Sequence, residues 1–461
     1  MFGTLDLNRF MVLLCLTLAA IAAVAWALLR LRRTAVVGAA YMAKVLCSIV
    51  FGTGRSVNPR TLEEVSADSY RPLRLFRSRV DREGRTVTAG LWPFASRTAT
   101  YRDLTGATLN FGGRTLIAQA PVPPGGNEAA SPDSPWRVSQ GPAALDRLVA
   151  SAFREPDPGR LRRTRAILVA KDGRIIAERY APDFGETTRF PGWSMTKSVL
   201  NALVGILVGE NRLSLTDRAL MPNWDASDPR ASITLDDLLR MRSGLAFSEV
   251  YEDLRSDVIE MLFNRPDAAA YAANRRLMAQ PGTTWSYASG TTNILSAILR
   301  RVVGDDDYPS WPRRALFAPL GMTSAIIEPD ASGTFVASSF MLATARDWAR
   351  FGQLYLQDGV WERRRLLPSG WVRYSTAQTP QAPGLIYGAH WWLGLKPELG
   401  GGTAAALRIP RDAFFAVGHE GQVLTVIPSL SLVVVRLGLS IHIDAWDHAS
   451  FLSELVDVIS A

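Results

Sequence analysis

Apolar residues along this chain form runs of different lengths, and each length predicts a different element. Residues 10–29 are uncharged and numerous enough to cross a lipid bilayer as one helix. Residues 195–208 are apolar almost all round, which is typical of a helix buried in a core. Short runs with the length of strands occur at 166–170, 174–180, 414–417, 422–427 and 431–437. The pattern therefore predicts both helices and strands around a large core.

Turn residues between these runs indicate hairpins. Asp172 and Gly173 separate the first two runs, a pattern typical of a tight β-hairpin. Residues 428–430 (Pro-Ser-Leu) separate the last two runs, and residues 445–459 predict a helix that closes the chain. Strands at both ends with helices between them predict an α+β fold, whose antiparallel sheet joins segments that are far apart in sequence.

The chain before residue 136 has a different pattern. Short alternating runs from 71 to 111 predict a small β region, and a stretch rich in Pro, Gly, Ser and Ala from 121 to 135 predicts a linker. The predicted segments are a membrane anchor at 1–33, a small β-containing region at 34–120, a linker at 121–135 and a main domain at 136–461.

Three arginines, Arg30, Arg32 and Arg33, directly follow the apolar run at 10–29. A cleaved signal peptide ends in small residues instead. We therefore predict a single-pass N-terminal transmembrane helix that anchors the protein in the inner (cell) membrane, with the lipid bilayer as its partner. The positive-inside rule would place the main domain on the cytoplasmic side.

Composition narrows the possible functions. The chain has 48% hydrophobic and 20% charged residues, which is ordinary for a globular protein and argues against extensive disorder. Its net charge of +8 is scattered, without a basic stripe that aromatic residues interrupt, so we predict no nucleic-acid partner. The four histidines and two cysteines lack metal-ligand spacing, so we predict no metal and no cofactor.

Lysine is rare in this chain, with four lysines against 47 arginines. One of them, Lys197, lies three residues after Ser194 in the sequence GWSMTK, at the start of the predicted core helix. Residues three apart share one face of a helix. Arginine cannot give up its proton in a protein, whereas a partly buried lysine can. Ser194 beside Lys197 therefore indicates a nucleophile and its base.

Two further motifs follow in order. Residues 287–289 (Tyr-Ala-Ser) precede an apolar run at 294–299, and residues 419–421 (His-Glu-Gly) lie between two predicted strands. The three motifs together resemble the serine β-lactamase and penicillin-binding-protein superfamily. Within it, the chain is most similar to the branch of class C β-lactamases, esterases and 6-aminohexanoate-dimer hydrolases. The resemblance runs from about residue 144 to the C-terminus. It implies a β-lactamase-like antiparallel sheet flanked by helices, with a mostly helical subdomain.

The resemblance also implies a role for each motif residue. Ser194 would attack a carbonyl carbon and form an acyl-enzyme, and Lys197 would accept its proton. Tyr287 would protonate the leaving group and later activate water. The backbone N–H groups of Ser194 and Gln422 would bind the oxyanion. Gly421 would let the strand edge approach the substrate closely.

Three positions bear on the substrate. His419 takes the place of a lysine in penicillin-recognising members, and Ser289 takes the place of an asparagine. Tyr251 resembles a substrate-contacting tyrosine of the 6-aminohexanoate-dimer hydrolases. Because histidine is mostly uncharged near neutral pH, it holds a carboxylate less well than lysine does. We therefore expect a small linear amide or ester as substrate, and not a β-lactam.

Two other functions stay open at this point. A membrane-anchored penicillin-binding-like sensor would form the acyl-enzyme with little turnover, and a transacylase would pass the acyl group to an amine. An α/β-hydrolase is excluded, because the chain has no Gly-x-Ser-x-Gly motif. The side of the membrane also stays open. Many relatives work outside the inner membrane, against the cytoplasmic placement that the arginines favour.

Overall fold

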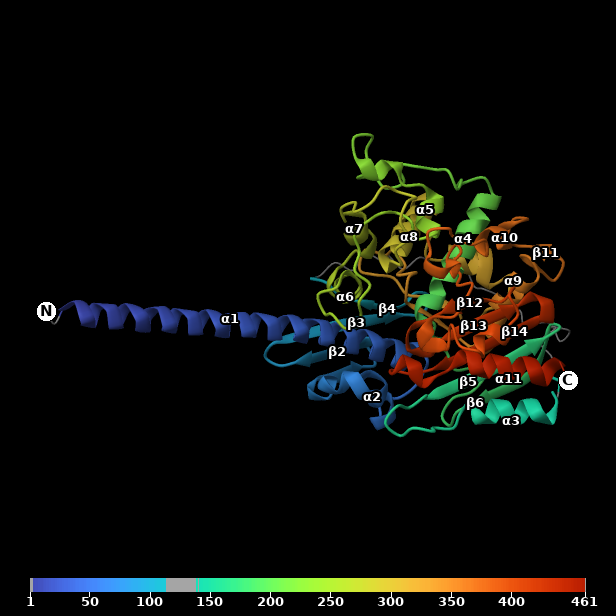
Figure 1. Ribbon diagram of the computed structural model, residues 1–461, viewed down its shortest axis with the longest axis horizontal. Helices are drawn as coiled ribbons and strands as arrows, with labels where there is room; N and C mark the ends of the chain where they lie inside the picture. Colours follow the sequence, from blue (N-terminus) through green and yellow to red (C-terminus); the bar gives the residue numbers. More distant parts are fainter. Residues whose placement is uncertain (1–2, 113–137, 140, 461) are drawn as a thin grey trace.

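The computed structural model describes residues 3–112, 138–139 and 141–460 (Figure 1). The predicted linker at 121–135 lies outside these residues. One long helix, α1 (Gly3–Cys47), projects from the rest of the molecule, and its last third enters the folded body. The body comprises a central sheet, a helical part beside it and a small N-terminal sheet packed on α1.

The central sheet has five strands in the order β12-β13-β14-β5-β6, and every neighbouring pair is antiparallel. The strands are β12 (Phe414–Val417), β13 (Val423–Ile427), β14 (Leu432–Gly438), β5 (Thr164–Lys171) and β6 (Arg174–Tyr180). The pairing of β14 with β5 places Val434 opposite Val169, which joins the two ends of the main domain. The predicted α+β, β-lactamase-like fold is confirmed.

Side chains of the central strands alternate between two cores, as the period of a strand requires. In β5, Leu168 and Ala170 face one core, whereas Ile167 and Val169 face the other. The first core is covered by α9 (Ala345–Leu356), which packs on β13, β14 and β5. The second is covered by α3 (Ala143–Ser151) and the C-terminal α11 (His448–Ser460). Burial on both faces explains why β5, β12, β13 and β14 are nearly continuous apolar runs, whereas the edge strand β6 alternates.

The helical part lies between β6 and β12 in sequence. Its central helix, α4 (Thr196–Gly209), is buried nearly all round, as its composition predicts. The other helices are α5 (Leu235–Leu239), α6 (Asp257–Asn264), α7 (Ala268–Ala273), α8 (Ser289–Val303) and α10 (Trp371–Ser375). Short strands pair as β7 (Phe190–Pro191), β9 (Met341–Ala343) and β8 (Ile326–Ile327), and as β10 (Val360–Trp361) and β11 (Arg364–Arg365).

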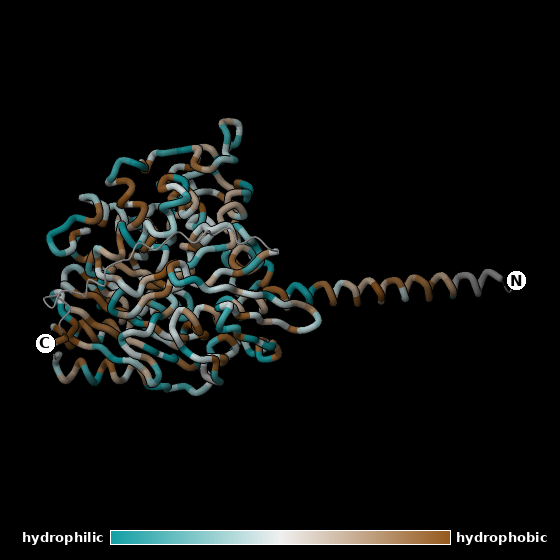
Figure 2. Tube along the Cα trace, turned by 180° about the vertical axis from the view of Figure 1, so that it is seen from behind, coloured by the Kyte–Doolittle hydropathy of each residue, from teal (hydrophilic) through white to brown (hydrophobic). Residues whose placement is uncertain are grey.

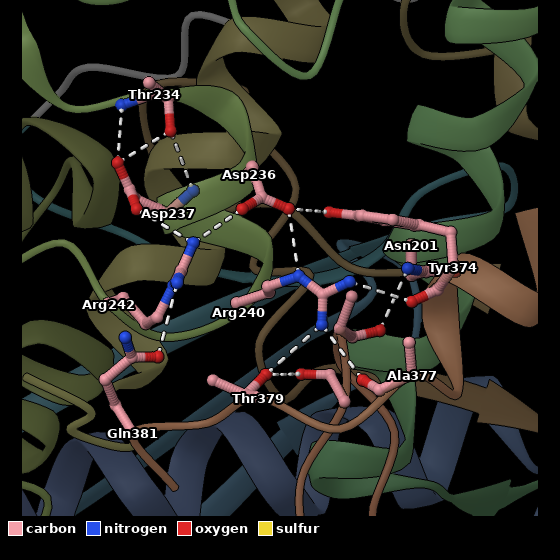
Figure 3. Close-up of polar contacts among 12 residues, drawn as sticks. Asn201, Thr234, Asp236, Asp237, Arg240, Arg242, Tyr374, Ala377, Thr379 and Gln381 are labelled. Atoms are coloured by element: carbon pink, nitrogen blue, oxygen red, sulfur yellow. Dashed lines mark hydrogen bonds and ion pairs between the residues drawn. The ribbon is translucent and has the colours of Figure 1, made fainter. Parts of the chain in front are cut away.

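An ion-pair cluster stiffens the segment after α5 (Figure 3). Asp236 accepts hydrogen bonds from Arg240 Nε at 2.9 Å and Tyr374 Oη at 2.6 Å, and Arg242 reaches its second oxygen at 2.6 Å. The backbone carbonyl of Met241 then accepts from the N–H of Ser286 at 2.9 Å. The cluster therefore supports the loop that leads into the second sequence motif.

We call residues 35–109 the N-terminal layer. It contains the buried end of α1, a helix α2 (Pro59–Ser66), a 3-10 segment η2 (Asp68–Leu75) and a four-stranded sheet. The strands, in sheet order, are β1 (Arg77–Asp81), β2 (Thr86–Leu91), β3 (Ala95–Arg102) and β4 (Gly106–Leu109). The apolar stretch after Arg33 is thus a core segment, since Ala39, Ala43 and Leu46 have no exposed surface.

A buried ion pair fastens this layer to the main domain. Lys44 of α1 pairs with Glu328, and both side chains are 3% exposed. The same carboxylate accepts hydrogen bonds from Ser48 Oγ at 2.9 Å and from the backbone N–H of Ala107 at 2.7 Å. Three separate parts of the layer therefore converge on one carboxylate of the main domain.

The projecting part of α1 is mostly hydrophobic and exposed (Figure 2). Within the described residues, it belongs to the one helix that is long and apolar enough to cross a membrane. Its most apolar window has a mean hydropathy of 2.6, and none of that window is buried. Membrane anchors and N-terminal signal sequences share these properties.

Candidate active site

Ser194 and Lys197 meet at the N-terminus of α4. Ser194 lies in the 3-10 turn η3 (Trp193–Met195), which leads directly into the helix. Lys197 Nζ lies 2.9 Å from Ser194 Oγ, 3.0 Å from Ser289 Oγ and 2.9 Å from the Ser338 carbonyl oxygen. The spacing of three residues thus brings the hydroxyl and the amine into hydrogen-bond contact.

The surroundings of Lys197 favour its neutral form. The residue is 2% exposed. Burial, helped by the charge of Lys396 and opposed by that of Glu249, lowers the pKa of Lys197 to about 8. The three atoms closest to its amine belong to hydroxyls and a carbonyl, not to a carboxylate. A substantial fraction of this lysine is therefore unprotonated at mildly alkaline pH.

Tyr287 stands beside this pair. Its ring centroid lies 4.9 Å from Lys197 Nζ, and the ring packs against Trp392 at 5.4 Å. Burial raises the pKa of the Tyr287 hydroxyl above its usual range, and contact with Ser194 opposes that rise. The phenol of the free protein therefore keeps its proton at neutral pH.

The third motif forms a 3-10 turn, η9 (His419–Gly421), between β12 and β13. The imidazole of His419 stacks on Tyr251 with centroids 4.9 Å apart, and its Nε2 lies 2.9 Å from Tyr70 Oη. Burial, together with the charge of Lys396, lowers the pKa of His419 to about 4. The structure thus brings two of the predicted substrate-binding residues, His419 and Tyr251, into direct contact.

Backbone strain marks both sides of the site. Trp193, directly before Ser194, has φ +48°, and Glu420 has φ +61°, values that side-chain-bearing residues rarely adopt. Trp193 Nε1 donates to Glu420 Oε2 at 3.3 Å, which ties the two strained turns together. A Cβ on Gly418 would lie 2.3 Å from the Gly192 carbonyl oxygen. The two loops therefore approach each other as closely as their backbones allow.

Gln422 and Gly421 occupy the far side of this junction. The Gln422 side chain is buried and exchanges two hydrogen bonds with the Gly438 backbone, at 2.7 and 2.9 Å. Its own backbone N–H has no acceptor among the described residues. A Cβ on Gly421 would lie 2.6 Å from Arg436 Nη1, and Arg436 donates to the Gly421 carbonyl at 2.8 Å. A buried arginine thus supports the turn that presents the Gln422 N–H.

Ser289 has a structural role that sequence analysis did not foresee. Its hydroxyl lies between Lys197 Nζ at 3.0 Å and Glu249 Oε1 at 2.5 Å, and its N–H donates to Glu249 Oε2 at 2.8 Å. Burial raises the pKa of Glu249. Sequence analysis missed Glu249, although it lies two residues before Tyr251 in the same segment.

Two more residues at the site escaped sequence analysis. Lys396 Nζ lies 4.6 Å from the Trp392 ring centroid and 5.3 Å from that of Tyr287. Tyr70 comes from η2 of the N-terminal layer. The scarcity of lysine was a usable signal for Lys396, whereas nothing in the sequence pairs residue 70 with residue 419. In the part of the chain that the structure describes, no three His, Cys, Asp or Glu side chains could hold a metal ion.

Comparison with known proteins places this geometry in a family. The sequence profile of the β-lactamase family matches residues 149–438. The chain belongs to the β-lactamase family. It is 28% identical over 322 residues to the 6-aminohexanoate-dimer hydrolase of Paenarthrobacter ureafaciens, which covers 63% of this chain and 77% of that protein.

Solved structures of this family have the same fold. A Bacillus anthracis protein provisionally named a 6-aminohexanoate-dimer hydrolase has a TM-score of 0.55 at 23% identity, covering 68% of this chain and 81% of that one. A penicillin-binding-protein homologue from Caulobacter crescentus has a TM-score of 0.51 at 18% identity, covering 68% and 99%. The recognised superfamily is confirmed, and the protein is an enzyme of the serine hydrolase type.

Proposed function

We propose that this protein hydrolyses linear amides or esters through an acyl-enzyme on Ser194. The observation that carries the proposal is the 2.9 Å contact between Ser194 Oγ and the amine of a buried lysine. Burial lowers the pKa of Lys197 to about 8, which suits a general base. A buried lysine at the start of an apolar helix is costly unless it has a function, and activation of Ser194 would supply one.

In the proposed reaction, neutral Lys197 accepts the proton of Ser194 as its oxygen attacks the substrate carbonyl. The oxyanion is bound by the N–H of Ser194, in the 3-10 turn that leads into α4, and by the N–H of Gln422. Tyr287 donates its proton to the leaving group. The tyrosinate then activates a water molecule that releases the acyl group.

The substrate class follows from the third motif and from Ser289. A His419 with a pKa of about 4 is neutral at pH 7, so it offers no fixed positive charge to a penicillin carboxylate. The Ser289 hydroxyl is already engaged by Lys197 and Glu249. The similar Paenarthrobacter protein is named a 6-aminohexanoate-dimer hydrolase, and this name supports a linear amide as substrate because two such amino acids join through one amide bond.

Hydrolysis of a substrate panel tests the proposal. The panel contains p-nitrophenyl esters, linear aminohexanoyl and D-amino-acid amides, and nitrocefin, with Ser194→Ala as the inactive control. We expect the best rates with an ester or linear amide, and labelling of Ser194 by a fluorophosphonate. A protein that labels at Ser194 and turns over nothing is a sensor, and one for which nitrocefin is best is a β-lactamase. Either result contradicts the proposal.

We also propose that residues 10–29 anchor the protein in the lipid bilayer of the inner membrane. The support is the exposed apolar surface of α1, which none of the described residues covers. Arg30, Arg32 and Arg33 lie at the end of this surface, where basic residues contact lipid headgroups. Carbonate washing of membranes tests the anchor, because a peripheral or processed protein is released.

A further inference from the structure

The four lysines of this chain differ in their partners. Lys44 and Lys171 each form an ion pair with a carboxylate. Lys197 is hydrogen-bonded to Ser194 within the site. Lys396 is the exception, since no hydrogen-bond acceptor or ion-pair partner within the described chain reaches its amine. A cation of this kind beside a reaction centre has unused capacity for a ligand.

The position of Lys396 defines where such a ligand would lie. The residue is half-buried, and its amine is held over the rings of Trp392 and Tyr287, at 4.6 and 5.3 Å from their centroids. Those rings stabilise a cation but do not replace a hydrogen-bond acceptor. Its charge reaches the reaction centre, since it lowers the pKa of both Lys197 and His419.

We propose that Lys396 binds a carboxylate on the leaving-group half of the substrate. This inference rests on the proposed function, because Tyr287 marks the leaving-group side by donating the proton there. An anion bound by Lys396 over the Tyr287 ring belongs to the fragment that departs first. The carboxylate-binding charge thus lies over the ring of Tyr287. Linear amides or esters with an anionic leaving half are the favoured substrates.

A pair of esters isolates this charge. The hexanoyl ester of 4-hydroxybenzoate has a carboxylate in its leaving group, and the hexanoyl ester of methyl 4-hydroxybenzoate does not. Lys396→Met should lower kcat/KM for the anionic ester by about 10- to 100-fold, the value of a charge-assisted hydrogen bond. For the neutral ester, with both proteins assayed on the alkaline plateau where Lys197 is unprotonated, the loss should stay below about threefold. Lys396→Arg should keep most of the preference, and Lys171→Met is the matched control at the surface.

Different outcomes of this experiment refute the Lys396 subsite and the proposed function. Equal losses on both esters overturn the inference, because Lys396 then acts only through Lys197 or Tyr287. No loss on either ester also overturns it. If wild-type protein hydrolyses neither ester, binding of 4-hydroxybenzoate to Ser194→Ala is measured by calorimetry, and the proposed function itself fails only if the whole substrate panel is also left intact. Binding that Lys396→Met abolishes supports the subsite, whereas binding that persists refutes it.

A second and independent observation concerns the N-terminal layer. Tyr70 Oη lies 2.9 Å from His419 Nε2, and the Tyr70 ring packs on Tyr41 of α1 with centroids 5.3 Å apart. Residue 70 lies outside the region that the β-lactamase profile matches, residues 149–438. We infer that Tyr70 is a positioning residue, which fixes the ring of His419 against Tyr251. The N-terminal layer then contributes a side chain to the site in addition to packing against the main domain.

A double-mutant cycle tests this role. Tyr70→Phe should lower kcat/KM roughly five- to tenfold, the value of one neutral hydrogen bond. In a His419→Ala background the same change should have a much smaller effect, because the contact with the imidazole is gone and only the contacts of the Tyr70 hydroxyl with Glu420 and Tyr41 remain. Tyr101→Phe, in the same layer and away from the site, is the control for loss of a buried hydroxyl. If Tyr70→Phe has the same effect in both backgrounds, or none in either, the inference is wrong.

Discussion

Two lysines of this protein are equally buried and differ in the charge of their partners. Lys44 and Lys197 are each 2% exposed, and each lies on a helix that the main core surrounds. Lys44 pairs with the carboxylate of Glu328, which requires its positive charge. Lys197 is held by two hydroxyls and a carbonyl, which carry no net charge and therefore do not require the lysine to be protonated. Burial is therefore the same for both lysines, and the charge of the partners is what would let Lys197, and not Lys44, act as the proposed base.

The two lysines should differ most in the effect of an arginine substitution on activity. Lys197→Arg should lower kcat by at least about 10³-fold, because a guanidinium cannot accept the proton of Ser194. Lys44→Arg keeps the charge opposite Glu328, so activity should stay within about tenfold of wild type. Ester hydrolysis measures both. An active Lys197→Arg enzyme would show that Lys197 is not the general base.

Removing the charge of Lys44 should affect stability more than catalysis. Lys44→Met leaves Glu328 buried without a counter-charge, and the free energy of unfolding should fall by about 3–5 kcal/mol. Adding Glu328→Gln removes the stranded charge, so the double variant should be more stable than the sum of the single changes allows. Denaturant unfolding measures all three variants. Strictly additive losses would show that the pair does not act as a unit.

The pH dependence of kcat/KM tests whether Lys197, unlike Lys44, acts in its neutral form. The base works when neutral, so kcat/KM should rise with pH and level off above the pKa of Lys197, which is about 8. Glu249 opposes the lowering of that pKa. Glu249→Gln should therefore move the rising limb to lower pH. A limb that stays in place, or moves upward, would exclude this electrostatic role for Glu249.

Deleting residues 1–33 should have the smallest effect on the enzyme itself. The deletion ends before the buried part of α1, and the lost partner Arg33 is half exposed. Its carboxylate, Glu260, keeps an ion pair with Arg265. Stability should fall by less than about 1 kcal/mol, and activity should stay within about threefold. The protein should move to the soluble fraction. A folded but inactive product would tie the anchor to catalysis.

Local spacing explains how much the sequence could predict. Ser194 and Lys197 lie one helical turn apart, so their contact follows from the helix alone. The strands and α4 follow from the lengths of apolar runs. Glu249, Lys396 and Tyr70 could not be predicted in this way, because their partners lie far along the chain. Tyr70 and His419 are 349 residues apart. Ser289 was predicted to bind substrate, yet the local motif could not reveal that Glu249 engages its hydroxyl.

Helix α1 runs without a break from the exposed apolar segment into the core, and this affects how the enzyme would encounter its substrate. An enzyme on a flexible stalk sweeps a volume above its membrane, whereas a single helix that runs from lipid into the core acts as a rigid post. The ring of Tyr41 packs on that of Tyr70 beside the site. Tyr41 follows the end of the apolar run at 10–29 by twelve residues, which is about 18 Å of helix. If residues 10–29 anchor the protein as proposed, the reaction centre would stay at a nearly constant height above the headgroups. Molecules that travel along the bilayer surface would meet it more often than molecules that diffuse freely through the surrounding water.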